Sequence, residues 1–197
     1  MMKYRILNIK NLTDSQFNSA FEKMSNERKS RCLRYKLSAD RRRMAFAEEL
    51  LRNLIAETFS VKENGILIKN LPSGKPVAEV NGKEVFVSLT HSGDFVACAV
   101  SDTSVGIDLE VKREVKPSLF KALNEDELEF VNKSEDKTSA FLEIWTAKEA
   151  YLKITGEGLA GLNKAKVLPF ILKGTLLNFK AEVNHTDQYF CTIIYEV

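Results

Sequence analysis

The segment at residues 105–111 constrains the fold most, because its side chains alternate strictly in character. It reads V-G-I-D-L-E-V. Such alternation is typical of a β-strand, whose successive side chains point to opposite faces of a sheet. One face would carry the apolar residues, and the other would carry Gly106, Asp108 and Glu110. The two carboxylates would then stand about 7 Å apart, beside a glycine that leaves space next to them.

Two neighbouring carboxylates repel each other unless a positive group neutralises them. Mg²⁺ is a natural partner, because it prefers oxygen ligands, takes few of them from the protein and usually brings phosphate groups with it. An ordinary strand with one solvated face is the alternative interpretation. The segment alone favours this alternative, because D-x-E is common on strands. A second segment is needed to decide between the two.

That second segment is a long helix, predicted from about Ser139 to Thr155 because the run holds good helix formers and no glycine or proline. Gly156 is a suitable C-cap. Glu149 and Lys153 lie four residues apart and share a face, where a surface ion pair would contribute only about 0.2–0.5 kcal/mol. Trp145, one turn earlier on the same side, indicates instead that this face is partly buried. Two charged groups need a functional reason to be there.

Together the two segments resemble the signature of the phosphopantetheinyl transferases. The first matches the family pattern (V/I)-G-(I/V)-D, and residues 145–153, W-T-A-K-E-A-Y-L-K, match (W/F)-(S/C/T)-x-K-E-(A/S)-x-x-K. The length and the N-terminal half resemble the monomeric, surfactin-synthetase-activating type. The resemblance implies an α+β pseudo-dimer of two similar-sized halves, each with a long helix packed on an antiparallel sheet. No repeat is visible in the sequence itself.

We expect the halves to be residues 1–104, with a basic segment that binds the phosphates of coenzyme A, and residues 105–197, with the metal-binding and catalytic motifs. The resemblance implies transfer of 4′-phosphopantetheine from coenzyme A to a serine hydroxyl of an apo acyl or peptidyl carrier protein, which leaves 3′,5′-ADP. Asp108, Glu110 and Glu149 would bind Mg²⁺, or Mn²⁺ in its place. Lys153 would neutralise charge on the phosphates. Glu149, or a water molecule beside it, would take the serine proton, so Asp108, Glu149 and Lys153 are the expected catalytic residues.

The basic segment at residues 28–43 is the candidate phosphate-binding region. It holds eight arginine and lysine residues and a single acid. A long helix is predicted to begin at Ser38 or Asp40, so the arginines at 41–43 would lie in its first turn, where the helix dipole disfavours positive charge. A phosphate bound at the helix N-terminus would explain this arrangement, and a solvated basic face is the alternative. The expected buried stripe of the helix is Met44, Ala47, Leu51, Leu54 and Ile55.

The resemblance implies contacts to coenzyme A at three places in the N-terminal half and at Lys153 in the C-terminal half. The basic segment supplies the expected contacts to the 3′-phosphate, a G-K-P motif in the hairpin loop at 71–75 supplies a lysine, and a T-H-S-G run at a strand end supplies a compact cluster of donors. From the residues alone, a plain loop and an ordinary turn histidine are the simpler interpretations of the last two. The expected contacts are Arg28, Arg31, Arg43, Lys75, Thr90, His91 and Lys153.

Elsewhere, apolar alternation predicts mainly β-structure. The expected strands lie at residues 66–69, 76–80, 85–89, 95–100, 166–172, 176–183 and 189–195, and two short helical pieces lie at 118–123 and 125–131.

Composition limits the class of protein. With 29 basic and 27 acidic residues the formal net charge is +2, which argues against a dedicated nucleic-acid binder. No apolar run is long enough to span a membrane, and the N-terminus lacks the apolar region of a signal peptide. Cys32, Cys98 and Cys191 form no C-x-x-C motif, so free thiols and a cytoplasmic location are expected. Cys32 lies among arginines that would lower its pKa, although a structural role is the expected one.

Two other classes of function stay open. A nucleic-acid-binding module could use residues 28–43, and it predicts binding that falls steeply with salt. A non-catalytic scaffold that binds carrier proteins could keep the fold without the reaction. For the enzyme we expect a monomer with no nucleic-acid or membrane partner, and a carrier protein of fatty-acid, polyketide or nonribosomal-peptide synthesis.

Overall fold

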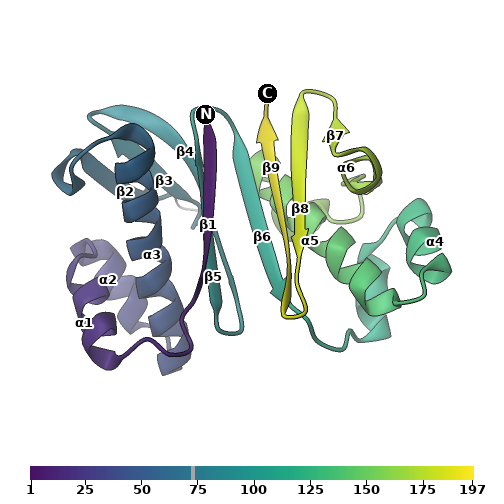
Figure 1. Cartoon of the computed structure of the whole chain (residues 1–197), viewed down its shortest axis with the longest axis horizontal. Helices are drawn as coiled ribbons and strands as arrows, with labels where there is room; N and C mark the ends of the chain where they lie inside the picture. The colour runs from purple at the N-terminus through teal and green to yellow at the C-terminus, as the bar shows by residue number, and fades with distance from the viewer. Residues whose placement is uncertain (72–73) are drawn as a thin grey trace. The chain divides into compact units, whose positions relative to one another are not determined.

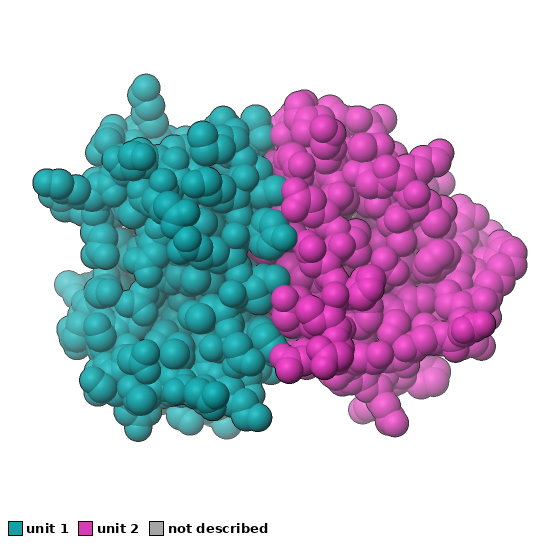
Figure 2. Space-filling model, in the orientation of Figure 1, with its two compact units in different colours: residues 1–103 teal, residues 104–197 magenta. Residues whose placement is uncertain are grey.

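One long helix packed on one antiparallel sheet recurs in both halves of the chain (Figure 1). The computed structural model describes residues 1–71 and 74–197, which separate into one unit at 1–103 and another at 104–197 (Figure 2). The fold is α+β, and the expectation that each half packs a long helix on an antiparallel sheet is confirmed.

The first unit contains a five-stranded sheet in the order β1-β5-β4-β3-β2. Its strands are β1 (Met2–Asn8), β2 (Ile66–Asn70), β3 (Pro76–Val80), β4 (Lys83–Ser92) and β5 (Phe95–Ser101). Its helices are α1 (Asp14–Glu22), α2 (Asn26–Leu33) and α3 (Ser38–Phe59), followed by the 3₁₀ turn η1 (Glu63–Gly65). The hairpin loop expected at 71–75 includes residues 72–73, which lie outside the described part of the chain.

Helix α3 packs on this sheet through the predicted apolar stripe. All five expected stripe residues are buried and belong to one core with strand residues such as Val87, Val96 and Val100. The helix begins at Ser38 and ends at Phe59, because Ser60, with a left-handed φ of 52°, caps it. Because the helix begins at Ser38, the arginines at 41–43 follow its first turn rather than forming it.

The second unit contains a four-stranded sheet in the order β6-β9-β8-β7. Its strands are β6 (Val105–Val111), β7 (Thr175–Leu176), β8 (Phe179–His185) and β9 (Tyr189–Glu196). Its helices are α4 (Glu125–Lys133), α5 (Lys137–Thr155) and α6 (Leu168–Lys173), with 3₁₀ turns η2 (Pro117–Ala122) and η3 (Gly158–Gly161). In both units the first strand pairs with the last, and the long helix lies between them in the sequence. The topology therefore repeats although the sequence does not.

Two of the expected strands near the C-terminus are wrong. The strand expected at 166–172 is instead helix α6, because Pro169 suits a first helical turn and Gly174, with φ 71°, caps the end. The strand expected at 176–183 is the hairpin of β7 and β8, and Leu177, with φ 55°, lies in its turn. Within the described part of the chain, no helix is long and apolar enough to cross a membrane.

Candidate functional site

Helix α5 lies directly on strand β6, and Gly106 makes this close approach possible. A Cβ atom built on Gly106 would lie 1.9 Å from the backbone oxygen of Ala150 and 3.1 Å from Cγ1 of Ile154. Only a residue without a side chain fits there. The open space expected at Gly106 is therefore a wrong prediction, because the backbone of α5 fills it. This contact holds α5 against the face of β6 that carries Asp108 and Glu110.

Lys153 and Asp108 form an ion pair between α5 and β6. The Nζ of Lys153 donates to Oδ1 of Asp108 at 2.8 Å and to the backbone oxygen of Ile107 at 2.7 Å. Asp108 is 6% exposed, and a carboxylate removed from water needs a charged partner. The distant strand and helix motifs therefore meet at this pair.

Glu149 lies within the electric field of the same groups. Burial raises the pKa of Glu149, the negative charge of Asp108 raises it further, and Glu110 adds a smaller effect that the charge of Lys153 opposes. A half-buried carboxyl group with a raised pKa is suited to accepting a proton.

The three carboxylates expected to bind a metal share this region but are not arranged as a ligand set. Among the residues that the structure describes, no group of three or more His, Cys, Asp or Glu side chains is placed to hold a metal ion. Glu110 pairs with Arg113 at 3.4 Å, and Asp108 pairs with Lys153. As donors, three carboxylates fit a hard cation such as Mg²⁺, and a positive ion would relieve the repulsion felt by Glu149. Binding one would require these side chains to move.

A buried pair of hydroxyl groups borders Asp108. The Oγ1 atoms of Thr146 on α5 and Thr192 on β9 lie 2.9 Å apart, and Thr192 is the residue opposite Asp108 in the β6–β9 pairing. Sequence reasoning missed both threonines, because only the strand register brings Thr192 beside Asp108.

Lys148, which precedes Glu149, is fully buried and anchors the helix from its other side. Its Nζ lies 2.7 Å from the carboxylate of Glu127 on α4, and it donates to the backbone oxygens of Leu162 and Ala165 at 2.6 and 2.7 Å. Glu127 also accepts from its own N-cap residue, Asn124, at 3.0 Å. Sequence reasoning missed this ion pair, because nothing local links α4 to α5.

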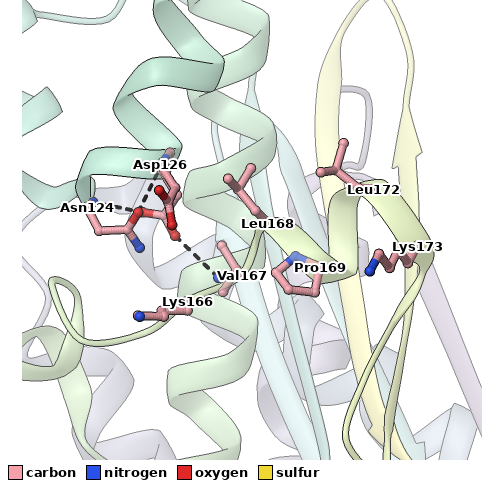
Figure 3. Close-up of a pocket in the computed structure, with 9 residues that line it drawn as sticks. Asn124, Asp126, Lys166, Val167, Leu168, Pro169, Leu172 and Lys173 are labelled. Atoms are coloured by element: carbon pink, nitrogen blue, oxygen red, sulfur yellow. Dashed lines mark hydrogen bonds between the residues drawn. The ribbon is translucent and has the colours of Figure 1, made fainter.

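A pocket of about 240 Å³ lies behind this anchor, between the start of α4 and helix α6 (Figure 3). Its lining includes Glu127, Asp126, Lys166, Leu168 and Leu172. None of the expected site residues lines it, so it is distinct from the Asp108 region.

In the first unit, Arg31 and the G-K-P motif lie together. Gly74 has a left-handed φ of 87°, and a Cβ built on it would lie 3.3 Å from Nη2 of Arg31. The backbone N–H of Leu71 donates to the oxygen of Lys75 at 2.9 Å, and that of Gly74 donates to the oxygen of Leu71 at 2.8 Å. Two of the expected phosphate contacts, Arg31 and Lys75, are thus neighbours around a turn that requires glycine.

Arg43 connects the start of α3 to the β4–β5 turn. Its Nη1 donates to the backbone oxygen of Gly93 at 3.0 Å, and its Nη2 donates to Asp40 at 2.6 Å. Strand β4 continues through the T-H-S run, so successive side chains point to opposite faces. Thr90 is buried while His91 is exposed. His91 lies on the same face of β4 as the core residues Val85 and Val87, and the donor cluster expected at the T-H-S-G run stays a prediction.

Other arginines of the basic segment contact protein groups. Arg41 donates to the backbone oxygen of Tyr35 at 2.8 Å, and Arg42 donates to Asp14 at 2.8 Å. A bound phosphate is therefore not needed to explain these cations near the start of α3. Arg28 is 4% exposed and donates to Glu48 and Asn70. Its expected contact to a phosphate stays a prediction.

All three cysteines are buried and free. Burial raises the pKa of Cys98 and of Cys191 to about 12, and it raises the pKa of Cys32 despite the opposing charge of Arg41. The lowered pKa expected for Cys32 is wrong, and its expected structural role agrees with its burial.

Comparison with known proteins identifies the family. Residues 104–194 match the model described as 4′-phosphopantetheinyl transferase superfamily, and residues 11–103 match the one described as 4′-phosphopantetheinyl transferase, N-terminal. The 4′-phosphopantetheinyl transferase psf-1 of Bacillus pumilus is 30% identical over 81% of this chain and 71% of its own length. The transferase HetI of Nostoc sp. is 31% identical over 78% and 68%, and Sfp of Bacillus subtilis is 26% identical over 70% and 62%. The chain therefore belongs to the 4′-phosphopantetheinyl transferase superfamily and is a transferase of the Sfp-like type.

Proposed function

We propose that this protein transfers 4′-phosphopantetheine from coenzyme A to a serine hydroxyl of an apo carrier protein, in a reaction that depends on Mg²⁺ and leaves 3′,5′-ADP. The observation that carries the proposal is the meeting of Asp108, Glu149 and Lys153 where α5 contacts β6. An acid with a raised pKa beside a lysine suits the transfer of a phosphate-bearing group to a hydroxyl.

In the proposed reaction the serine oxygen forms a bond to the β-phosphorus, and the bond from that phosphorus to the departing 3′,5′-ADP breaks. Glu149, or a water molecule beside it, takes the serine proton, and the half-buried position of Glu149 near Asp108 and Lys153 supports this role. Lys153 moves from Asp108 to the phosphate oxygens and neutralises the charge that develops on the leaving group. The residues that would hold the metal are Asp108, Glu110 and Glu149. When bound, Mg²⁺ would polarise the phosphorus.

Residues of the first unit contact the phosphates of coenzyme A in this proposal. Arg31 and Lys75 are supported by their proximity around Gly74, and Arg43 is supported by its position at the turn that follows His91. Thr90 is retained as a contact, although it lies on the opposite face of β4 from His91. Arg28 is proposed as a contact as well, through a side chain that also donates to Glu48 and Asn70.

We further propose a monomer in the cytoplasm that acts on a carrier protein of fatty-acid, polyketide or nonribosomal-peptide synthesis. The nucleic-acid-binding alternative has weaker support, because the arginines at 41–43 bind protein groups. The scaffold alternative leaves the pairing of Lys153 with the buried Asp108 without a purpose.

Mass spectrometry tests the proposed reaction. Apo carrier protein incubated with coenzyme A, Mg²⁺ and this protein should gain one phosphopantetheine per chain. Asp108→Asn, Lys153→Met and a chelator should each abolish the gain. Lys3→Met is the matched control, because Lys3 forms an exposed ion pair with Glu57 at 3.7 Å and lies on β1, which carries none of the proposed contacts. Full transfer by Asp108→Asn would refute the assignment of this carboxylate.

A further inference from the structure

The pocket between helices α4 and α6 takes no part in the proposed reaction (Figure 3). Its volume is about 240 Å³, which is below the range of about 300–1,000 Å³ that pockets for small molecules usually span. Val167, Leu168 and Pro169 give it an apolar lining, and Leu172 belongs to the lining although 64% of its surface is exposed. A hollow of this size and character suits one large apolar side chain better than a whole small molecule.

The charges that line the pocket are unequal. Glu127 belongs to the lining, but its carboxylate is paired with the buried Lys148 at 2.7 Å. The other charged residues of the lining are Lys166 and Lys173, from the segment that leads through α6, and Asp126, from the first turn of α4. Because Lys148 neutralises the charge of Glu127, two cations line the pocket against one acid.

The two lysines belong to a stretch of the chain that contains no acid. Residues 158–181 hold four exposed lysines and no arginine, aspartate or glutamate; the lysines are Lys164, Lys166, Lys173 and Lys180. In the described part of the second unit the ion pairs are made by other cations, which are Lys112, Arg113, Lys133, Lys148 and Lys153. The stretch therefore carries a positive charge that the unit itself does not balance locally, and this charge is complementary to an acidic partner.

We propose that the pocket is a docking site for an acidic segment of a partner protein, with one apolar side chain of the segment in the pocket and its carboxylates against Lys166 and Lys173. Apolar anchors that fill pockets carry much of the binding energy of protein interfaces, and complementary charges around them fix orientation. Repulsion by Asp126 directs the acidic residues of the segment away from α4. The site is separate from the proposed reaction, because none of the residues assigned to that reaction lines the pocket.

An anionic membrane surface is the other partner that attracts lysines and apolar side chains together. Insertion into lipid needs apolar side chains that project from the surface, as on one face of an amphipathic helix. Here Val167 is fully buried and Leu168 and Pro169 are half-buried, so these apolar groups line a hollow. The concave shape favours a protein segment over lipid.

Binding of a synthetic peptide tests the proposal. The probe is a helical peptide in which leucines recur on one face between glutamates, and the comparison peptide has lysine in place of each glutamate. Amide chemical shifts in NMR titrations report both the contact site and the dissociation constant. The acidic peptide should shift the amides of residues 166–173 and bind more weakly as salt rises, whereas the lysine peptide should leave them unchanged. Absence of binding by the acidic peptide, or shifts centred on residues 28–43, would overturn the proposal.

Single substitutions separate the parts of the docking site. Lys173→Glu and Leu172→Ser should each weaken binding of the acidic peptide about 5-fold, and both should fold because the two side chains are exposed. Asp126→Asn should tighten binding about 2-fold, because it removes a repulsion. Lys10→Glu is the matched control, since Lys10 is an exposed lysine of the first unit and the net charge changes equally; its dissociation constant should stay within about 2-fold of wild type. Equal weakening by Lys10→Glu would overturn the proposal.

Two measurements exclude other uses of the pocket. Lys173→Glu should transfer phosphopantetheine to an isolated carrier protein as fast as wild type, and slower transfer would overturn the separation of the pocket from the reaction. Wild type should stay in solution when phosphatidylglycerol vesicles are sedimented. Sedimentation with the vesicles that Lys173→Glu abolishes would identify lipid as the partner and overturn the proposal. The peptide titration needs no transfer activity, so its result is independent of whether the proposed function holds.

Discussion

Replacing Gly106 with alanine tests whether the contact between α5 and β6 sets the geometry of the site. The added Cβ would lie 1.9 Å from the oxygen of Ala150 and 2.9 Å from its carbonyl carbon. A tolerable carbon–oxygen contact is roughly 3 Å, so helix and strand must separate by about 1 Å. Both obstacles are backbone atoms, which no change of rotamer can move. Since Ala150 follows Glu149 directly, the shift displaces Glu149 and Lys153 relative to Asp108.

We expect Gly106→Ala to lose about 1–3 kcal/mol of stability from overpacking and about 100-fold in kcat from a displacement of about 1 Å. Urea denaturation and the carrier-protein mass assay measure the two effects separately. The control is Gly65→Ala, whose Cβ would meet only the flexible side chain of Asn81, at 2.6 Å from Oδ1; it should keep wild-type turnover. Wild-type kcat and stability in Gly106→Ala would refute the reasoning, because they would mean that the helix approach is not constrained by this glycine.

Three further perturbations test the surroundings of the site. Lys148→Met should cost about 3–5 kcal/mol in urea denaturation, because it leaves Glu127 buried without a cation, and adding Glu127→Gln should recover most of that loss; an unchanged loss would contradict the pairing. Thr146→Val should cost about 1–3 kcal/mol by leaving the hydroxyl of Thr192 unpaired, whereas Thr192→Val should cost less, because Thr146 still donates to the backbone oxygen of Glu143 at 3.1 Å; equal losses would count against this asymmetry. Burial raises the pKa of Glu143 above 4.5, so the stability that this group contributes is complete below about pH 4.5 and is lost as pH rises through its folded pKa. Unfolding free energies measured from pH 4 to 8 should therefore show the advantage of Glu143→Gln over wild type growing with pH, and a constant difference would refute the raised pKa.

The elements of the site could be predicted because their signals are local. The strict alternation of residues 105–111 predicts β6, and the run of helix formers that ends at Gly156 predicts α5. Residues 166–172 were mistaken for a strand because a short apolar run fits the periodicity of a strand and of a helix equally well. Only Pro169 and Gly174 favour a helix. Local patterns thus located strand β6 and helix α5 but not helix α6, which follows them in the chain.

The contacts between elements could not be predicted in the same way. The sequence shows a glycine at position 106 but not that the backbone of α5 fills the space beside it. The burial of Arg28 was missed for a different reason, since the basic segment was treated as a charge pattern rather than as a helix. Arg28 and Cys32 lie four residues apart and are both buried, so a helix with Ser25 as its N-cap would have placed Arg28 on the inner face.

The two units share one topology but carry different charges at corresponding positions. This difference explains why no repeat is visible in the sequence. Each unit needs an apolar core and an anchor between its short and long helices, and many sequences satisfy those requirements, since either polarity of ion pair serves. The charged positions with proposed chemistry are divided between the units. Strand β6 carries two acids, whereas its topological counterpart β1 carries none, and the proposed phosphate contacts of the first unit are mostly cations. Opposite charges at matching places leave little residue-level similarity while the packing of helix on sheet is kept. On this argument, the Arg28–Glu48 and Lys148–Glu127 ion pairs are expected to tolerate exchange of their charges better than Asp108, Glu149 and Lys153 tolerate any substitution.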